Sequence, residues 1–318
     1  MRTFPKSLLW ILLGLVSSIT ILLFACQSIP NKPILEPISL QGHRGARGLY
    51  PENTWPAMQA AMHYGMNTVE LDTVLTKDGK LVIFHDLYVT DQKCRLPNKD
   101  SFQPIAVRSL TLAELKKFDC GSVKNPDFPD QKLIPNTSLM SLEEFFQKLQ
   151  NWEQQRQKSV ITNVEAKIYP DASSKQIKKH AKRVLELLRK YKREKKAIVQ
   201  SFYMSFLREI KKKNPRITTA ALFSLTKWEG LLMIIGFGTE KQKEIIQKAL
   251  AVQADIISPH YYYISDSFIR DCHLNNLAVI PWTVNSTSQM KKLLEKGVDG
   301  IITDYPDRLA NLVKKPKV

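Results

Sequence analysis

Two acidic side chains in one apolar stretch have the type and spacing needed to bind a cation. Glu70 and Asp72 are separated by one residue inside the apolar run 68–75. Successive side chains of a β-strand alternate between its two faces, so both carboxylates point the same way. Two carboxylates held together away from water are costly unless a cation lies between them. The spacing therefore predicts a divalent-metal site with oxygen ligands.

Two histidines follow other apolar runs and are the candidate acid and base. His43 comes shortly after the run 38–40. His85 follows the run 81–84 and precedes Asp86, which is a candidate to orient a histidine ring. Imidazole titrates near neutrality, so one ring can take a proton from a nucleophile while the other donates a proton to the leaving group. We interpret His43 and His85 as this pair and leave open which is the acid.

Short motifs surround these side chains and continue through most of the chain. In order they are HRG at 43–45, PENT at 51–54, ELD at 70–72, KDG at 77–79 and HD at 85–86. Later stretches are NVEAK at 163–167, QSF at 200–202, WTVN at 282–285 and VDGIITDYP at 298–306. No single motif is specific, but the ordered set resembles the glycerophosphodiester phosphodiesterase family over roughly residues 38–310.

The resemblance implies roles for further side chains. It implies that Glu165 completes the metal site and that Lys167 helps to hold a phosphate. We expect Arg44 to hold the phosphate by a bidentate contact. Trp282 is predicted to stack on the alcohol part of a substrate, with a place in the barrel core as the alternative. Glu52, in a stretch predicted to cap the first helix, is a further candidate at the metal site. Oxygen-only ligands favour Ca²⁺ or Mg²⁺ over zinc.

The implied reaction is hydrolysis of a glycerophosphodiester to glycerol 3-phosphate and an alcohol. Attack by the glycerol 2-hydroxyl, through a cyclic phosphate, and direct attack by water both remain open. Alternative functions are a lysophospholipase D acting on lysophospholipids and a non-catalytic barrel that binds phospholipid headgroups. A metal-independent phospholipase C is disfavoured because it would leave Glu70, Asp72 and Glu165 without a role. The net charge of +17 suits anionic substrates or a membrane surface, and no motif indicates nucleic-acid binding.

Strand-like runs alternate with amphipathic helical runs along the body of the chain. Such alternation predicts a parallel sheet with helices outside, and eight repeats predict a closed (β/α)8 or TIM barrel, the fold that the resemblance also implies. Strands are predicted at 38–43, 68–75, 160–166, 197–201, 217–222, 254–258, 278–284 and 299–303. Helices are predicted at 54–64, 141–150, 174–193, 203–212, 240–251, 266–275 and 287–296.

A ninth strand-like run, 81–84, does not fit this alternation. The KDG turn before it is too short for the crossover that joins parallel strands. We therefore predict that residues 74–84 form a β-hairpin folded over the mouth of the barrel. The hairpin would return His85 to the same end of the barrel as Glu70 and Asp72.

The stretch 87–135 is predicted to be an insertion at the catalytic face, where specificity usually resides in a barrel enzyme. Within it, the run 111–118 has the capping-box pattern of a short helix. Cys94 and Cys120 both lie in the insertion. They either form a disulfide or remain two free thiols, and the sequence leaves both alternatives open. Cys272 falls in a helical run and is expected to serve packing.

The N-terminus has the pattern of a targeting segment. Basic residues precede the apolar run 8–25, and Cys26 follows it. This pattern resembles a bacterial lipoprotein signal, which is cleaved before the cysteine and acylated on it. An uncleaved membrane anchor is the alternative. Either places the body on the periplasmic side of a membrane. We predict a targeting segment at 1–26, a proline-containing linker at 27–37 and a catalytic domain at 38–318.

Overall fold

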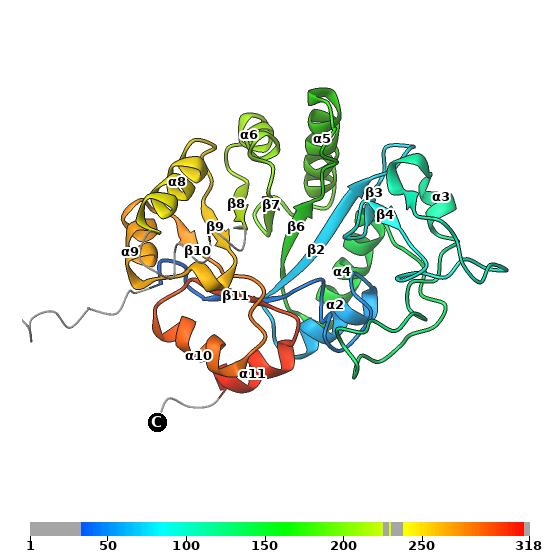
Figure 1. Cartoon of the computed structure of the whole chain (residues 1–318), viewed down its shortest axis with the longest axis horizontal. Helices are drawn as coiled ribbons and strands as arrows, with labels where there is room; N and C mark the ends of the chain where they lie inside the picture. The colour runs from blue at the N-terminus through cyan, green and yellow to red at the C-terminus, as the bar shows by residue number, and fades with distance from the viewer. Residues whose placement is uncertain (1–32, 225–228, 230–237, 315–318) are drawn as a thin grey trace, which may run out of the picture.

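In the computed structural model, which describes residues 33–224, 229 and 238–314, eight parallel strands form the centre of the molecule (Figure 1). Neighbouring strands follow the order β10-β9-β8-β7-β6-β2-β1-β11. All but β10 lie close to the predicted bounds. The strands are β1 (Ser39–Gly42), β2 (Thr68–Leu75), β6 (Ile161–Ala166), β7 (Ala197–Ser201), β8 (Thr218–Phe223), β9 (Ile256–Pro259), β10 (Ala278–Val279) and β11 (Gly300–Thr303).

Backbone hydrogen bonds between the two end strands nearly close the sheet into a barrel. The amide of Asp299 donates to the carbonyl of Val279 (2.8 Å), and that of Ile302 donates to the carbonyl of Pro281 (3.0 Å). Regular pairing covers only the first two residues of the predicted strand 278–284. Pro281 has no N–H with which to continue the ladder on both sides. The predicted (β/α)8 barrel is thus confirmed, with one irregular strand.

Helices surround the strands on their outer side (Figure 1). The seven predicted helices are present among the described residues, and α4 continues past its predicted end through good helix formers. The final helix, α11, was not predicted; it begins at a proline, which suits the first turn of a helix. The helices are α2 (Trp55–His63), α4 (Leu142–Arg156), α5 (Ser174–Lys190), α6 (Met204–Lys213), α8 (Thr239–Leu250), α9 (Asp266–Leu274), α10 (Thr287–Glu295) and α11 (Pro306–Lys314).

The chain enters the barrel at the end opposite the carboxyl ends of the strands. The amides of Ile34 and Leu35 both donate to Oδ1 of the buried Asp299, which directly precedes β11. Leu35 packs against the apolar filling of the barrel. That filling consists of Ile198, Ala220, Ile256, Ala278, Ile280 and Ile302. The described end of the predicted linker is therefore fixed to the floor of the barrel.

The predicted hairpin is present, but it packs against α4 and α5 on the outside of the barrel instead of folding over the mouth. Strand β3 (Leu81–Ile83) pairs antiparallel with the second half of β2, with Thr73 opposite Ile83 and Leu75 opposite Leu81. The amide of Phe84 donates to the carbonyl of Asp72 (3.2 Å). This bond brings the chain back to the carboxyl end of the barrel immediately before His85.

The insertion forms a small unit of its own beside the hairpin (Figure 1). It contains the strand pair β4 (Tyr88–Val89) and β5 (Ile105–Ala106) and the helix α3 (Leu112–Leu115). The Thr111 side chain accepts from the amide of Glu114, whose carboxylate accepts from the Thr111 amide, so the predicted capping box is confirmed. A separate apolar cluster packs this unit onto the hairpin.

Cys94 and Cys120 form a disulfide with an S–S distance of 2.00 Å, which answers the question left open by the sequence. Cys94 is fully buried in the apolar cluster of the insertion. Cys272 is a buried free thiol within α9, as expected for a packing residue.

Within the described part of the chain, no helix combines the length and the apolar character needed to cross a membrane. The predicted targeting segment 1–26, including Cys26, lies outside the described residues.

We predict that replacing both Cys94 and Cys120 by serine lowers the free energy of unfolding by about 3 kcal/mol. A cross-link over 26 residues restricts the unfolded chain by roughly this amount. Chemical denaturation of the oxidised protein and of the double variant measures the difference. A reducing agent should shift the wild-type midpoint to that of the double variant and leave the double variant unchanged. Equal midpoints of the oxidised protein and the double variant would contradict the prediction.

Candidate active site

Three acidic side chains meet at the carboxyl end of the barrel. Glu70 and Asp72 lie on β2, and Glu165 lies on β6, directly opposite Asp72 in the parallel register. One carboxylate oxygen from each lies within 4.8 Å of the others. Their exposed fractions are 0%, 0% and 5%. The inward direction predicted from strand alternation is confirmed, and the third acid joins the first two.

The electrostatics of this triad leave negative charge insufficiently compensated. Burial, followed by the charges of Asp72 and Glu165, raises the pKa of Glu70 well above its usual value. Burial raises the pKa of Glu165 to about 7 although Lys167 opposes it. Burial also acts to raise the pKa of Asp72, but the charges of Lys167 and Arg44 outweigh it and hold the pKa below its usual range. Two of the three carboxyls therefore resist ionisation where they stand.

The triad has the donor set of a metal site. Oδ1 of Asp72 and Oε1 of Glu165 are buried, and both face the single ammonium group of Lys167. A divalent cation would supply the positive charge that one lysine leaves missing. Glu70, Asp72 and Glu165 can therefore hold a metal ion through oxygen ligands.

Neutral side chains and one backbone amide fix the direction of the acids. Gln200 Nε2 donates to Oε1 of Glu70 (3.1 Å), and the amide of Arg44 donates to its Oε2 (2.7 Å). Asn53 Nδ2 donates to Oδ2 of Asp72 (2.8 Å). These hydrogen bonds hold the carboxylates of Glu70 and Asp72 in one orientation and leave lone pairs on their oxygens for a metal ion.

His43 lies directly after β1 and contacts an aspartate that directly follows the last strand. Its Nδ1 is 2.7 Å from Oδ1 of Asp304, and the ring is almost fully buried. Because a carboxylate only accepts, Nδ1 carries the proton and Nε2 is left for proton exchange. Burial, only partly opposed by Asp304, lowers the pKa of His43. The ring is therefore neutral near pH 7.

His85 is likewise paired with an aspartate. Its Nδ1 is 2.6 Å from Oδ1 of Asp86, so the role proposed for Asp86 from the sequence agrees with the geometry. Burial lowers the pKa of His85, and the hydrogen bond to Asp86 opposes this. The two imidazoles thus come from separate segments near the acidic triad. In each ring Nδ1 contacts an aspartate, and Nε2 does not take part in that contact.

Two cations touch the acidic triad. Lys167 Nζ lies 3.2 Å from Oδ1 of Asp72 and 2.5 Å from Oε1 of Glu165. Arg44 is buried, with Nε 3.4 Å from Oδ2 of Asp72. These are the two side chains expected to contact a phosphate, and the structure brings both to the triad.

Glu52 is placed differently from its prediction as a metal-site residue. Both of its oxygens accept from Nη1 of Arg44 (3.0 and 2.9 Å), and its carboxylate also contacts Arg47 (2.9 Å) and Lys93 (3.0 Å). These cations outweigh burial and lower the pKa of Glu52 to about 2. A carboxylate already shared by three cations is an anchor for Arg44 rather than a fourth member of the acidic triad.

Trp282 belongs to an aromatic group at the mouth of the barrel. Its indole is half-buried, donates from Nε1 to the carbonyl of Ser258 (2.7 Å) and packs on the barrel filling. The ring meets Phe202 edge-on at 5.6 Å and His260 at 5.4 Å. Phe202 in turn lies 5.9 Å from Nζ of Lys167. Trp282 therefore packs against the barrel core, one of its two predicted places, and its predicted stacking on a substrate alcohol stays a prediction.

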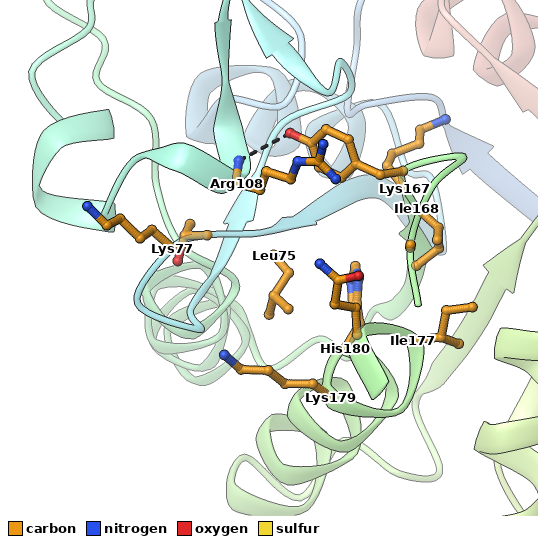
Figure 2. A pocket seen from close by; sticks show the side chains of 12 residues that line it. Leu75, Lys77, Arg108, Lys167, Ile168, Ile177, Lys179 and His180 are labelled. Carbon is orange, nitrogen blue, oxygen red and sulfur yellow. Dashed lines mark hydrogen bonds between the residues drawn. The ribbon is translucent and has the colours of Figure 1, made fainter. Parts of the chain in front are cut away.

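A hollow of about 220 Å³ adjoins this centre on the outside of the barrel, between the hairpin and α5 (Figure 2). Figure 2 shows Lys77, Arg108 and Lys179 around it and His180 in its wall. Lys167 also contributes to the wall, but its ammonium group contacts the acidic triad. The hollow is thus a basic surface feature separate from the triad.

Several residues of the site were missed by sequence analysis. Asp304 stands in the TDYP stretch that the family resemblance already included, but nothing local connects it with His43. Gln200 and Asn53 likewise lie in quoted motifs without having been given a role. Lys93 had no signal at all, because its position depends on the path of the insertion.

Comparisons with known proteins agree with this geometry. Residues 43–308 match the model of the glycerophosphoryl diester phosphodiesterase family. A glycerophosphodiester phosphodiesterase of Caldanaerobacter subterraneus subsp. tengcongensis is 33% identical over 277 residues, which cover 86% of this chain and 96% of the relative.

Solved structures show the same fold. A crystal structure from Silicibacter pomeroyi has a TM-score of 0.77 and 24% identity, covering 87% of this chain and 94% of its own. An Oleispira antarctica phosphodiesterase in complex with the product sn-glycerol-3-phosphate has a TM-score of 0.67 and 21% identity, covering 87% and 98%.

The fold and the site define a barrel hydrolase with an acidic centre flanked by histidines. The family model covers most of the chain and therefore gives the class of enzyme. The chain belongs to the glycerophosphoryl diester phosphodiesterase family and is a glycerophosphodiester phosphodiesterase, a phosphoric diester hydrolase, as predicted from the sequence.

We predict that Glu52→Gln destabilises the protein by about 3 kcal/mol at pH 7 and by progressively less as the pH falls toward 2. The folded-state pKa of about 2 lies below the ordinary value of 4.5, so ionised Glu52 stabilises the fold above pH 4.5 and this contribution is lost as the pH falls through 2. Denaturant unfolding of both proteins between pH 7 and 3 measures the difference. A gap that stays constant over this range would exclude the proposed charge anchor.

Proposed function

We propose that this protein hydrolyses glycerophosphodiesters to glycerol 3-phosphate and an alcohol, with a divalent cation held by Glu70, Asp72 and Glu165. One observation carries the proposal: three buried, incompletely compensated carboxylates lie beside two histidines that are each backed by an aspartate. The family match and the product-bound phosphodiesterase of the same fold support it.

Ca²⁺ or Mg²⁺ is the cation that this donor set favours, because the three protein ligands are carboxylate oxygens. When bound, the cation withdraws negative charge from the phosphodiester. The three acids remain ionised around it. Lys167, which contacts both Asp72 and Glu165, offsets part of the negative charge of the triad.

The two histidines perform the proton transfers in this proposal. The free Nε2 of one ring takes the proton of the attacking hydroxyl, and the Nε2 of the other protonates the departing alkoxide. Asp304 and Asp86 keep the rings of His43 and His85 in the required tautomer and stabilise each imidazolium as it forms. The glycerol 2-hydroxyl and water are the two candidate nucleophiles.

Arg44 and Lys167 hold the phosphate, and Trp282 packs on the alcohol moiety. The Glu52 carboxylate engages Nη1 of Arg44 and Asp72 lies 3.4 Å from its Nε, so Nη2 is the guanidinium nitrogen left for a phosphate oxygen. Phe202 connects Lys167 to Trp282 through ring contacts, which gives the alcohol an aromatic surface next to the charged centre.

We predict that the protein releases glycerol 3-phosphate from glycerophosphocholine, glycerophosphoethanolamine or glycerophosphoglycerol, and that excess EDTA abolishes the release until Ca²⁺ or Mg²⁺ is restored. His43→Ala and His85→Ala should each lower kcat by about 10²- to 10⁴-fold, the usual contribution of a general acid or base. An enzyme-coupled assay for glycerol 3-phosphate provides the measurement.

His63→Ala is the matched control, because His63 is an exposed histidine of α2 outside the site. It should keep wild-type activity. Full activity in EDTA would overturn the metal assignment, and full activity of His43→Ala would overturn the acid–base assignment. Release of choline from lysophosphatidylcholine but not from glycerophosphocholine would favour a lysophospholipase D instead.

We also propose that the protein is tethered to a membrane on the periplasmic side through its N-terminus. The attachment of Ile34 and Leu35 to Asp299 supports this, because it fixes the first described residues at the floor of the barrel, opposite the catalytic mouth. A catalytic face turned away from its tether would remain open to small soluble diesters.

We predict that Cys26→Ser moves the protein from the detergent phase to the aqueous phase in detergent partitioning. Loss of the acylated cysteine removes the only lipid that a cleaved lipoprotein would carry. Mass spectrometry of the mature N-terminus should show a lipid on Cys26. A wild-type protein that keeps residues 1–25 and carries no lipid on Cys26 would identify an uncleaved anchor.

A further inference from the structure

One lysine of the insertion joins the two charged groups that flank the acidic triad. Lys93 Nζ lies 2.7 Å from Oδ2 of Asp86 and 3.0 Å from Oε1 of Glu52. The other oxygen of Asp86 lies 2.6 Å from Nδ1 of His85. The other oxygen of Glu52 lies 2.9 Å from Nη1 of Arg44. The ammonium group of Lys93 therefore contacts both the carboxylate that pairs with His85 and the carboxylate that pairs with Arg44.

The contact matters most for Asp86, whose side chain is 34% exposed. A carboxylate at this exposure is free to turn toward water unless a second contact holds it. Lys93 engages one oxygen and leaves the other directed at His85. The pairing also keeps Asp86 ionised, since the hydrogen bond from His85 and the charge of Lys93 outweigh burial and lower the pKa of Asp86.

The disulfide fixes the backbone from which Lys93 extends. Cys94 is the next residue, is fully buried and is bonded to Cys120. The amides of Lys93 and Cys94 both donate to the carbonyl of Thr90 (3.1 and 3.0 Å), so the lysine stands on a tight turn closed by the cross-link. The flexible lysine stem thus begins at a rigid point.

We propose that Lys93 is a positioning residue for the phosphodiesterase reaction: it holds Asp86 against His85 and Glu52 against Arg44, and the Cys94–Cys120 disulfide keeps it in place. The proposal rests on the acid–base role given above to His85. In this proposal the insertion, which contributes no residue to the acidic triad, holds the residues that orient His85 and Arg44. It also makes activity sensitive to the redox state of one disulfide.

The first test compares Lys93→Met with Lys93→Arg and with Lys99→Met, a matched exposed lysine of the same insertion. Lys93→Met should lower kcat about 10- to 100-fold with a smaller change in KM, because the histidine is misaligned rather than removed. Lys93→Arg should recover most of the loss, and Lys99→Met should behave as wild type. Unchanged kcat in a folded Lys93→Met variant would overturn the proposal.

A double-mutant cycle separates positioning from general stability. Because Lys93 acts in part through Asp86, Lys93→Met combined with Asp86→Asn should lower kcat by less than the product of the two single losses. The loss that remains in the Asp86→Asn background reports the contact of Lys93 with Glu52. Losses of kcat that multiply would overturn the proposal, because they would mean that the two residues act independently. Thermal unfolding of each variant, followed by circular dichroism, confirms that the comparison is made between folded proteins.

Reduction of the Cys94–Cys120 disulfide provides an independent test that needs no substitution. Dithiothreitol should lower kcat of the wild type toward that of Lys93→Met and should not slow Lys93→Met further. An equal fractional loss in both proteins would overturn the link between the disulfide and the lysine. Complete inactivity of the oxidised wild type on every diester would instead refute the proposed function, so the two failures are distinguishable.

Discussion

The mutual repulsion of three buried carboxylates is the constraint on which this structure depends. Glu70, Asp72 and Glu165 come together because β2 and β6 are neighbours in a parallel sheet and their register places two acids side by side. Burial without full compensation raises the pKa of Glu70 and of Glu165. Lys167 and Arg44 offset part of this charge, and a divalent cation would offset the rest. In the function proposed above, a cation held by these acids would let the barrel bind an anionic phosphodiester.

Proton transfer requires a second arrangement, which the fold provides from distant segments. Closure of the barrel brings Asp304, after the last strand, against His43, after the first. The hairpin returns His85 and Asp86 to the carboxyl end of the barrel. Each ring has a carboxylate at its Nδ1, but the two carboxylates are held differently. Asp304 is buried and accepts from Asn285, whereas Asp86 is 34% exposed and contacts Lys93.

Sequence patterns predicted what depends on local periodicity. Alternation along β2 placed Glu70 and Asp72 on one face, and the short KDG turn predicted the hairpin. Contacts between distant residues were not accessible in this way: His43 and Asp304 are 261 positions apart. Glu52 was misplaced because its neighbours Arg44, Arg47 and Lys93 meet only in the folded chain, where three cations claim its carboxylate.

The most direct test of the central claim is an anomalous diffraction measurement on crystals soaked in Mn²⁺, a divalent ion with the same preference for oxygen ligands. The account predicts one strong peak among the carboxylates of Glu70, Asp72 and Glu165, at a bonding distance of about 2.2 Å from an oxygen of each. A strong peak elsewhere with none at the triad, or an empty triad at saturating Mn²⁺, would contradict it.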